Sequence, residues 1–282
     1  MKLNSSPLPT LSLQRRHEIT ACAESIALHR FPDAQVDPEA IAAQEGIVIL
    51  YTDLPRPVDG LLVHENGRYT IVGNERRAPR GSPRSRFTLA HELAHYFLAD
   101  HHPALATGTL AARTPHPGHP GRRFEHEADI FAASLLMPAE PFRELAISTG
   151  EGGLDLVVEL ADLFGTSLTA TAYRALELDF FHVPSAVFLW DHAGAPAGRR
   201  ISPATLGLGP EYCGLADLLP TESITAGAIR NRRWGQHRGR SHLMNWFTAL
   251  DGYDPRHQVL VSEEVKSLGA HGWMTLVHAA ET

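Results

Sequence analysis

The stretch FTLAHELAHYFLADHHP, residues 87–103, combines the spacing of a buried helix with four histidines and two acidic residues. Apolar residues such as Phe87, Ala90 and Phe97 recur at helical intervals, which predicts a helix with one buried face. Histidines on such a face need polar partners. The stretch therefore indicates a polar site built against the core of the protein.

His91 and His95 lie four residues apart in HELAH, so both imidazoles project from one face of the helix and can share one ion. Glu92 lies about 100° further round the helix, where it reaches water at the ion without being a ligand. A chance match on a surface helix is the competing interpretation, and the buried face weakens it. The segment predicts a peptide-hydrolysing metal site with Glu92 as its catalytic base.

The third ligand is expected from the next helical segment, FEHEADIFAASLLM, in which Glu125 and Asp129 lie four residues apart. Glu125 can complete the coordination sphere, while Asp129 accepts a hydrogen bond from the far nitrogen of a ligand histidine. The competing interpretation is an acidic helix start in solvent, where carboxylates also suit the helix dipole.

A rival third ligand is His101, because the three histidines then have the spacing of the metzincins. That pattern requires a glycine three residues after the second histidine, and Leu98 stands there. We therefore favour Glu125 over His101. Glu127 and His102 remain as further candidates.

The remaining pattern predicts an α+β fold. Helical spacing covers residues 11–29 and 38–45, and strand patterns follow in IVILYTDL, GLLVHENG and RYTIVGN, with a hairpin turn at Asn66-Gly67. Residues 75–86 have the composition of a turn-rich connector, and helical spacing resumes at Phe87.

Later segments suggest further divisions of the chain. Residues 101–123 have the composition of a long surface loop, and residues 154–178 indicate two helices joined at Gly165. Short apolar runs separated by Gly and Pro then predict a smaller, strand-rich part. We predict three segments, 11–150, 151–181 and 182–282.

Composition limits the class of protein. The net charge of -7 disfavours nucleic-acid binding by the molecule as a whole, and no apolar run reaches the roughly 20 residues that span a membrane. The start of the chain lacks the apolar segment of a signal peptide, so we expect a cytoplasmic protein without membrane contact.

Cysteine usage limits the metal chemistry. The two cysteines, Cys22 and Cys213, lie far apart without metal-binding spacing, so any metal uses nitrogen and oxygen ligands. Two imidazoles and one carboxylate favour zinc, with manganese or iron as alternatives.

Three segments in order, RFTLAHELAHYFL, EHEADIFAASLLMP and LADLFGTSLTATAYRALEL, resemble the ImmA/IrrE family of bacterial regulatory metallopeptidases. The preceding GIVILYTDLPRPVDGLLVHENGRYTIVGNERR also resembles the sheet region of that family. The resemblance covers about residues 15–180.

The resemblance implies a minimal gluzincin-like peptidase domain, a small sheet with active-site helices, followed by helix-turn-helix-like helices. It implies metal ligands at His91, His95 and Glu125 and a general base at Glu92. Asp129 occupies a position that the family often fills with Asn or Asp.

Family members inactivate DNA-binding repressors, so the resemblance implies an endopeptidase that cleaves a helix-turn-helix repressor in a stress or DNA-damage response, or in control of a mobile element. The family's IrrE branch carries a GAF-like sensor domain, to which residues 183–282 match only weakly.

Two other functions fit parts of the sequence. A DNA-binding regulator could use the helix pair in residues 160–178 or the arginine-rich segment 228–246, but the second helix of the pair offers only Arg174 as a cation. Direct nucleic-acid binding is therefore not favoured. A metal-binding protein that regulates by contact alone is the third alternative, and the intact Glu92 argues against it.

Overall fold

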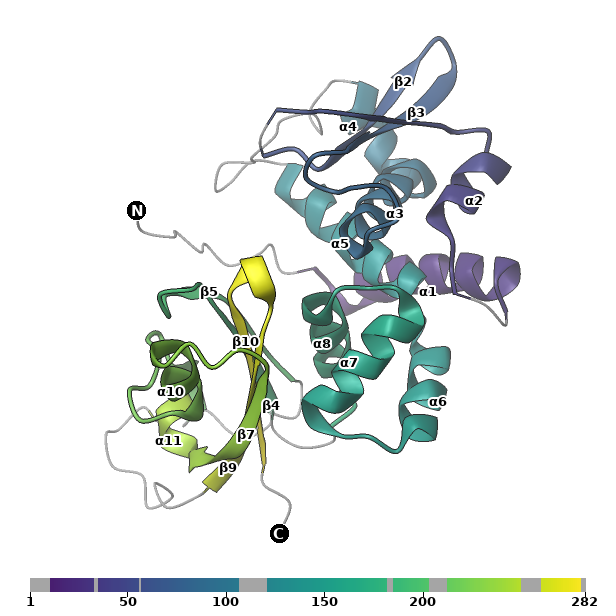
Figure 1. Cartoon of the computed structure of the whole chain (residues 1–282). Coiled ribbons are helices and arrows are strands. Elements are labelled where there is room, and N and C mark those ends of the chain that lie inside the picture. Colours follow the sequence, from purple (N-terminus) through teal and green to yellow (C-terminus); the bar gives the residue numbers. More distant parts are fainter. Residues whose placement is uncertain are drawn as a thin grey trace. The chain divides into compact units, whose positions relative to one another are not determined.

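The computed structural model of the chain describes residues 11–32, 35–55, 57–106, 121–181, 185–202, 212–249 and 260–279 (Figure 1). The chain divides into two compact units, Met1–Phe142 with Asp162–Ser167 and Arg143–Ala161 with Leu168–Thr282. Helices and sheets both contribute, which confirms the predicted α+β class. The three predicted segment boundaries stay predictions.

The first unit is built from helices around a small sheet. Its elements are α1 (Leu13–Arg30), α2 (Pro38–Gln44), β1 (Val48–Thr52), β2 (Gly60–Glu65), β3 (Arg68–Asn74), α3 (Pro83–Phe97), η1 (Ala99–His101), α4 (His102–Ala106) and α5 (Gly121–Leu136). Two further helices, α6 (Ala139–Thr149) and α7 (Gly153–Phe164), contribute residues to both units.

The predicted hairpin forms at the predicted turn. Strand β2 pairs antiparallel with β3, and Glu65 lies opposite Arg68. The two residues between them, Asn66 and Gly67, have φ angles of 51° and 75°, the left-handed conformations that a two-residue hairpin turn requires. Strand β1 lies parallel to β3 on its other side, so the sheet has the order β1-β3-β2 and β2 is an edge strand.

Helix α3 begins at Pro83, so the prediction that helical structure resumes at Phe87 was wrong by one turn. Ser82 is extended and its side chain accepts a hydrogen bond from the Ser85 amide at 3.1 Å, which caps the helix, and Pro83 occupies the first turn. Part of the expected connector is therefore helical. Arg86 in this turn donates to the Val36 and Gly165 carbonyl oxygens, at 2.6 and 3.1 Å.

Helices α3, α5 and α1 pack closely because small residues line their contact faces. Ala90 and Ala94 of α3, Ala128 of α5 and Ala23 of α1 are all completely buried. Side chains without branches let the backbones approach, and larger residues such as Phe131 fill the space around them. This packing holds the polar segment HELAH against α5.

The prediction of one long loop over residues 101–123 was wrong in part. His101 closes the 3-10 turn η1, residues 102–106 form α4, and α5 already begins at Gly121. Residues 107–120 lie outside the described part of the chain.

The second unit is strand-rich, as predicted. It contains α8 (Leu168–Glu177), β4 (Ser185–Trp190), β5 (Pro196–Ile201), β6 (Tyr212–Leu215), α10 (Ile224–Arg230), β7 (Gln236–His242), α11 (Leu243–Trp246), β8 (Phe247–Ala249), β9 (Leu260–Ser267), η2 (Gly269–His271) and β10 (Trp273–Ala279). An antiparallel sheet has the order β5-β4-β10-β9-β7, and β6 pairs with β8.

The five-stranded sheet has apolar side chains on both faces, since alternate residues of a strand point to opposite sides. Phe188 and Trp190 of β4 pack with Trp246 of α11, whereas Val187 packs with Leu154 of α7 and other apolar side chains. Helix α8 belongs to this second cluster. Its one cation, Arg174, is 2% exposed and pairs with Glu177 at 3.2 Å.

Among the described residues, no helix combines the length and the apolar content needed to cross a membrane.

Candidate metal centre

His91 and His95 project from α3 toward one point. Their Nε2 atoms are 3.3 Å apart, which is the convergence expected from their spacing of one helical turn. The His95 side chain is 4% exposed and that of His91 is 16% exposed. The two rings therefore present one pair of nitrogen donors at the edge of the core.

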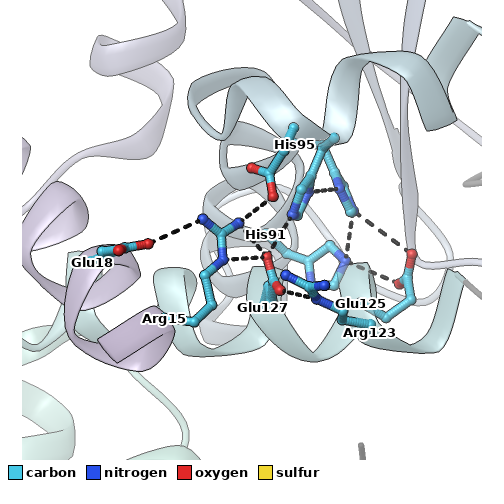
Figure 2. A network of polar contacts seen from close by, with 9 residues as sticks. Arg15, Glu18, His91, His95, Arg123, Glu125 and Glu127 are labelled. Carbon is cyan, nitrogen blue, oxygen red and sulfur yellow. Dashed lines mark hydrogen bonds and ion pairs between the residues drawn. The ribbon is translucent and has the colours of Figure 1, made fainter. Parts of the chain in front are cut away.

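Glu125 brings a carboxylate to the same point from α5. Its Oε2 lies 3.2 Å from His91 Nε2 and its Oε1 lies 3.7 Å from His95 Nε2 (Figure 2). The three donor atoms all lie within 4.8 Å of one another. Among the described residues, the structure thus groups the three side chains expected from the sequence, and their role as ligands stays a prediction.

Asp129 contacts the opposite side of His91, as expected. Its Oδ1 lies 3.0 Å from His91 Nδ1. Burial lowers the pKa of His91, but hydrogen bonds with Asp129 and Glu125 outweigh this and raise the pKa well above its usual value. Because Asp129 accepts, His91 Nδ1 donates, and Nε2 is directed at Glu125.

Glu92 is the buried acid of the group, with 7% of its surface exposed. Burial and the nearby Glu125 raise its pKa, whereas His91 and the Leu62 amide, which donates to it, lower its pKa. The resulting pKa is about 7. Such a pKa suits a group that must take up and release protons near neutral pH.

His101 lies outside the cluster that His91, His95 and Glu125 form. It is completely buried, and its Nδ1 lies 2.9 Å from Nδ1 of His95, the nitrogen that faces away from Glu125. Its other nitrogen, Nε2, is 3.2 Å from Glu127 Oε2. Although its spacing resembles that of a metzincin ligand, His101 thus contacts Nδ1 of His95 and does not join the three donor atoms.

Glu127 is also completely buried and accepts hydrogen bonds from two arginines. Arg15 Nε donates at 3.0 Å, Arg15 Nη2 also donates, and Arg123 Nε donates at 2.6 Å. Burial raises the pKa of Glu127, but the bonds from Arg15, Arg123 and His101 lower it to about 2. The sequence indicated Glu127 and His101 only as alternative ligands, and nothing in the local spacing indicated Arg15.

A cavity of about 600 Å³ opens beside the three donors. The whole of β2 forms one wall, from Gly60 to Glu65, and residues of α3 and α5 form another. His91, His95 and Glu125 all line it, together with Glu92. Their side chains can therefore act on a molecule that enters between β2 and α3.

Two imidazole nitrogens and one carboxylate oxygen within reach of one another are a donor set that fits a divalent metal with an open position toward the cavity. Burial of His95 beside His91 and His101 lowers the pKa of His95 to about 2, so this imidazole is neutral and can donate an electron pair. The residues present therefore fit a metal.

The chain is similar to known proteins in sequence and in fold. Residues 42–176 match the sequence model of the IrrE N-terminal-like domain, Peptidase M78. No curated protein matches the chain. Among solved structures, the chain is similar to a Mycobacterium tuberculosis transcriptional regulator, with 14% identity and a TM-score of 0.59 over 94% of this chain and 78% of that chain.

At this identity the similarity to the regulator concerns the fold alone. The family match spans α3 and α5 together with the small sheet, and it confirms the predicted resemblance. Residues 42–176 are therefore similar to the IrrE N-terminal-like domain of Peptidase M78, and this similarity supports a metallopeptidase in general terms.

Proposed function

We propose that this protein is a zinc-dependent endopeptidase that cleaves and thereby inactivates a DNA-binding repressor of the helix-turn-helix type in the cytoplasm. The observation that carries the proposal is the grouping of His91, His95 and Glu125 at a cavity that also contains the buried Glu92. Zinc suits this set of two imidazoles and a carboxylate, and manganese or iron are the alternatives.

The wall of the cavity supports a peptide substrate. Strand β2 forms the edge of its sheet in the described part of the chain, and its residues line the cavity along its whole length. An edge strand offers unpaired backbone donors and acceptors, to which an extended peptide can add as a further strand. A peptide bound along β2 would pass in front of the three donors.

The reaction that follows uses this chain's own groups. His91, His95 and Glu125 would hold the zinc, and zinc held there would supply Lewis acidity toward a peptide carbonyl and toward water. Glu92 takes a proton from the attacking water on a carboxylate oxygen and passes it to the leaving amide nitrogen. Its raised pKa, about 7, matches both halves of this transfer.

The repressor substrate rests on the family resemblance. Repressor cleavage would link the peptidase to a stress or DNA-damage response, or to the control of a mobile element. The test is to mix the zinc-loaded protein with the helix-turn-helix repressor encoded nearest to it. We expect a single cut, which a chelator prevents and zinc restores; an intact repressor under these conditions would refute the assignment of this substrate.

Replacing Glu92 by Gln should separate metal binding from catalysis. We expect Glu92→Gln to retain zinc and to lose cleavage by roughly 10²- to 10⁴-fold, the usual contribution of a general base. Zinc content is measured on the purified variant, and cleavage by gel electrophoresis. Glu75→Gln, on an exposed glutamate, is the matched control. Unchanged cleavage by Glu92→Gln would contradict the role of Glu92.

Direct regulation of DNA is the second candidate. The arginine-rich segment supports it, since Arg232, Arg233 and Arg240 are exposed. The helix pair supports it less, because α8 packs on the sheet of the second unit and Arg174 is buried. A gel shift at two salt concentrations discriminates, since contact with phosphates weakens steeply as salt rises.

A further inference from the structure

The nitrogen of His95 that faces away from the proposed metal has an unusual partner, a second histidine. His95 Nδ1 lies 2.9 Å from His101 Nδ1, and the two rings are 5.0 Å apart. His101 is completely buried, with the Phe124 ring at 4.8 Å on another side. A buried imidazole held between two polar groups has a defined orientation, so His101 limits how the His95 ring can turn.

The far side of His101 is fixed by a carboxylate that can only accept. Glu127 Oε2 lies 3.2 Å from His101 Nε2, and the guanidinium groups of Arg15 and Arg123 both donate to Glu127 (Figure 2). Two cations at one buried carboxylate keep it ionised, and an ionised carboxylate has no proton to donate. His101 Nε2 must therefore carry the proton in this contact.

The direction of the remaining hydrogen bond follows from this. A neutral imidazole has one donor and one acceptor nitrogen, so His101 Nδ1 accepts when Nε2 donates. His95 Nδ1 must then donate to His101. The lone pair of His95 is left on Nε2, the atom that lies 3.3 Å from His91 Nε2 and 3.7 Å from Glu125 Oε1.

A second metal site at Asp100, His101 and Glu127 is the competing explanation, since these three side chains also lie close together. Arg15 excludes it. Its Nη2 donates to Asp100 Oδ2 at 2.6 Å and also to Glu127 Oε2, so a guanidinium already supplies the positive charge between the two acids. The cluster is a chain of hydrogen bonds and not an ion site.

We propose that His101 is a positioning residue that, held by Glu127 and Arg15, fixes the tautomer and ring orientation of His95 with its Nε2 lone pair toward the metal. The proposal rests on the metal site of the proposed function. Asp129 does the same for His91, but its side chain is 58% exposed whereas those of His101 and Glu127 are 0% exposed. The buried chain is therefore the more rigid of the two supports.

The tautomer of His95 can be measured without metal or substrate. In the metal-free protein labelled with ¹⁵N-histidine, long-range ¹H–¹⁵N spectra show which ring nitrogen carries the proton. We expect the His95 proton on Nδ1 in the wild type and a shift toward Nε2 in His101→Phe, which keeps a ring against Phe124 but has no acceptor. A wild-type His95 proton on Nε2 would overturn the proposal.

Metal affinity gives the second measurement, with Co²⁺ as the probe and its visible absorption as the signal. We expect His101→Phe to weaken Co²⁺ binding by about 10- to 100-fold, as loss of a partner behind a ligand does. His101→Asn should recover much of the affinity, because its amide oxygen can accept from His95 Nδ1. His29→Phe, the same change at an exposed histidine of α1, is the matched control and should bind as the wild type does.

Circular dichroism of the metal-free variants separates positioning from folding. If His101→Phe does not fold, Arg15→Met replaces it, and we expect a smaller loss of Co²⁺ affinity in the same direction. A folded His101→Phe with wild-type Co²⁺ affinity overturns the proposal, as does a wild type that binds no Co²⁺. A wild type that binds Co²⁺ and cuts no repressor refutes the proposed function alone.

Discussion

The backbone conformation of a single residue, Leu98, decides which nitrogen of His95 the His101 ring meets. Leu98 follows α3 with φ of -86° and ψ of 96°, so the chain turns there in an extended conformation and needs no glycine. The turn brings His101 back beneath α3, onto Nδ1 of His95 and away from Nε2. A histidine six residues after the second histidine of the motif can therefore either bind a metal or contact a ligand from behind. The backbone geometry at Leu98 determines which of the two occurs.

Asp129 offers the corresponding test on His91, the other histidine of the proposed metal site. Removing its carboxylate in Asp129→Ala takes away the acceptor of His91 Nδ1 at 3.0 Å, so both the ring orientation and the tautomer are less well fixed. We expect zinc affinity to fall by about 10-fold, near the lower end for such partners because Asp129 is exposed. Competition with a coloured chelator measures it.

Asp53→Ala removes an exposed aspartate on the connection after β1 and should leave zinc affinity unchanged. Equal affinities in Asp129→Ala and the wild type would show that His91 needs no such support.

At the level of elements, the site depends on how closely β2 crosses α3. Gly60 begins β2, and a β-carbon built there would overlap Cγ2 of Thr88 and lie 3.4 Å from Oε1 of Glu92. The absence of a side chain at Gly60 thus lets the edge strand lie directly over the segment that carries Glu92. This contact fixes one wall of the cavity.

Gly60→Ala should therefore destabilise the protein by about 1–3 kcal/mol, the usual effect of an added methyl in a filled space. Thr88→Ser removes the methyl group that the new β-carbon meets, so the double variant should regain part of that loss. Urea denaturation of both single variants and the double variant measures the coupling.

Gly152→Ala is the control, since a β-carbon there meets nothing within 4 Å and φ is not positive. Strictly additive free energies for Gly60→Ala and Thr88→Ser would show that the strand accommodates the methyl by moving elsewhere.

At the scale of the whole molecule, the proposed metal centre and the aromatic core belong to different units. The proposed ligands lie in the first unit, whereas the four tryptophans, Trp190, Trp234, Trp246 and Trp273, lie in the second. Tryptophan fluorescence therefore reports on the second unit alone, while circular dichroism reports on the helices of both.

Zinc should raise the midpoint of thermal unfolding of the first unit and leave the tryptophan transition where it is. Binding to the folded state alone adds about 2.7 kcal/mol when the free zinc concentration is 100 times the dissociation constant. We expect the shift in circular dichroism to vanish in a His91→Ala/His95→Ala variant. Equal shifts in both signals would mean that the two units unfold together, and no shift in either would contradict the metal site.

The sequence by itself determined the features that depend on local geometry. Helical periodicity predicted α3 and α5, Asn66-Gly67 predicted the hairpin, and the four-residue spacing of His91 and His95 predicted that their rings converge. These follow from the pitch of a helix or the dihedral angles of one turn, which a few neighbouring residues set.

Only the tertiary structure decided what lies behind the proposed ligands. Arg15, His101 and Glu127 come from α1, η1 and α5, and their contacts span 112 and 26 positions of the chain. The hydrogen bonds of Arg86 with Val36 and Gly165 likewise join segments that are distant in the chain, and no local pattern encodes them. Packing of distant elements, and not residue spacing, gives a buried charge its partners, so the contacts behind His95 could be seen only in the fold.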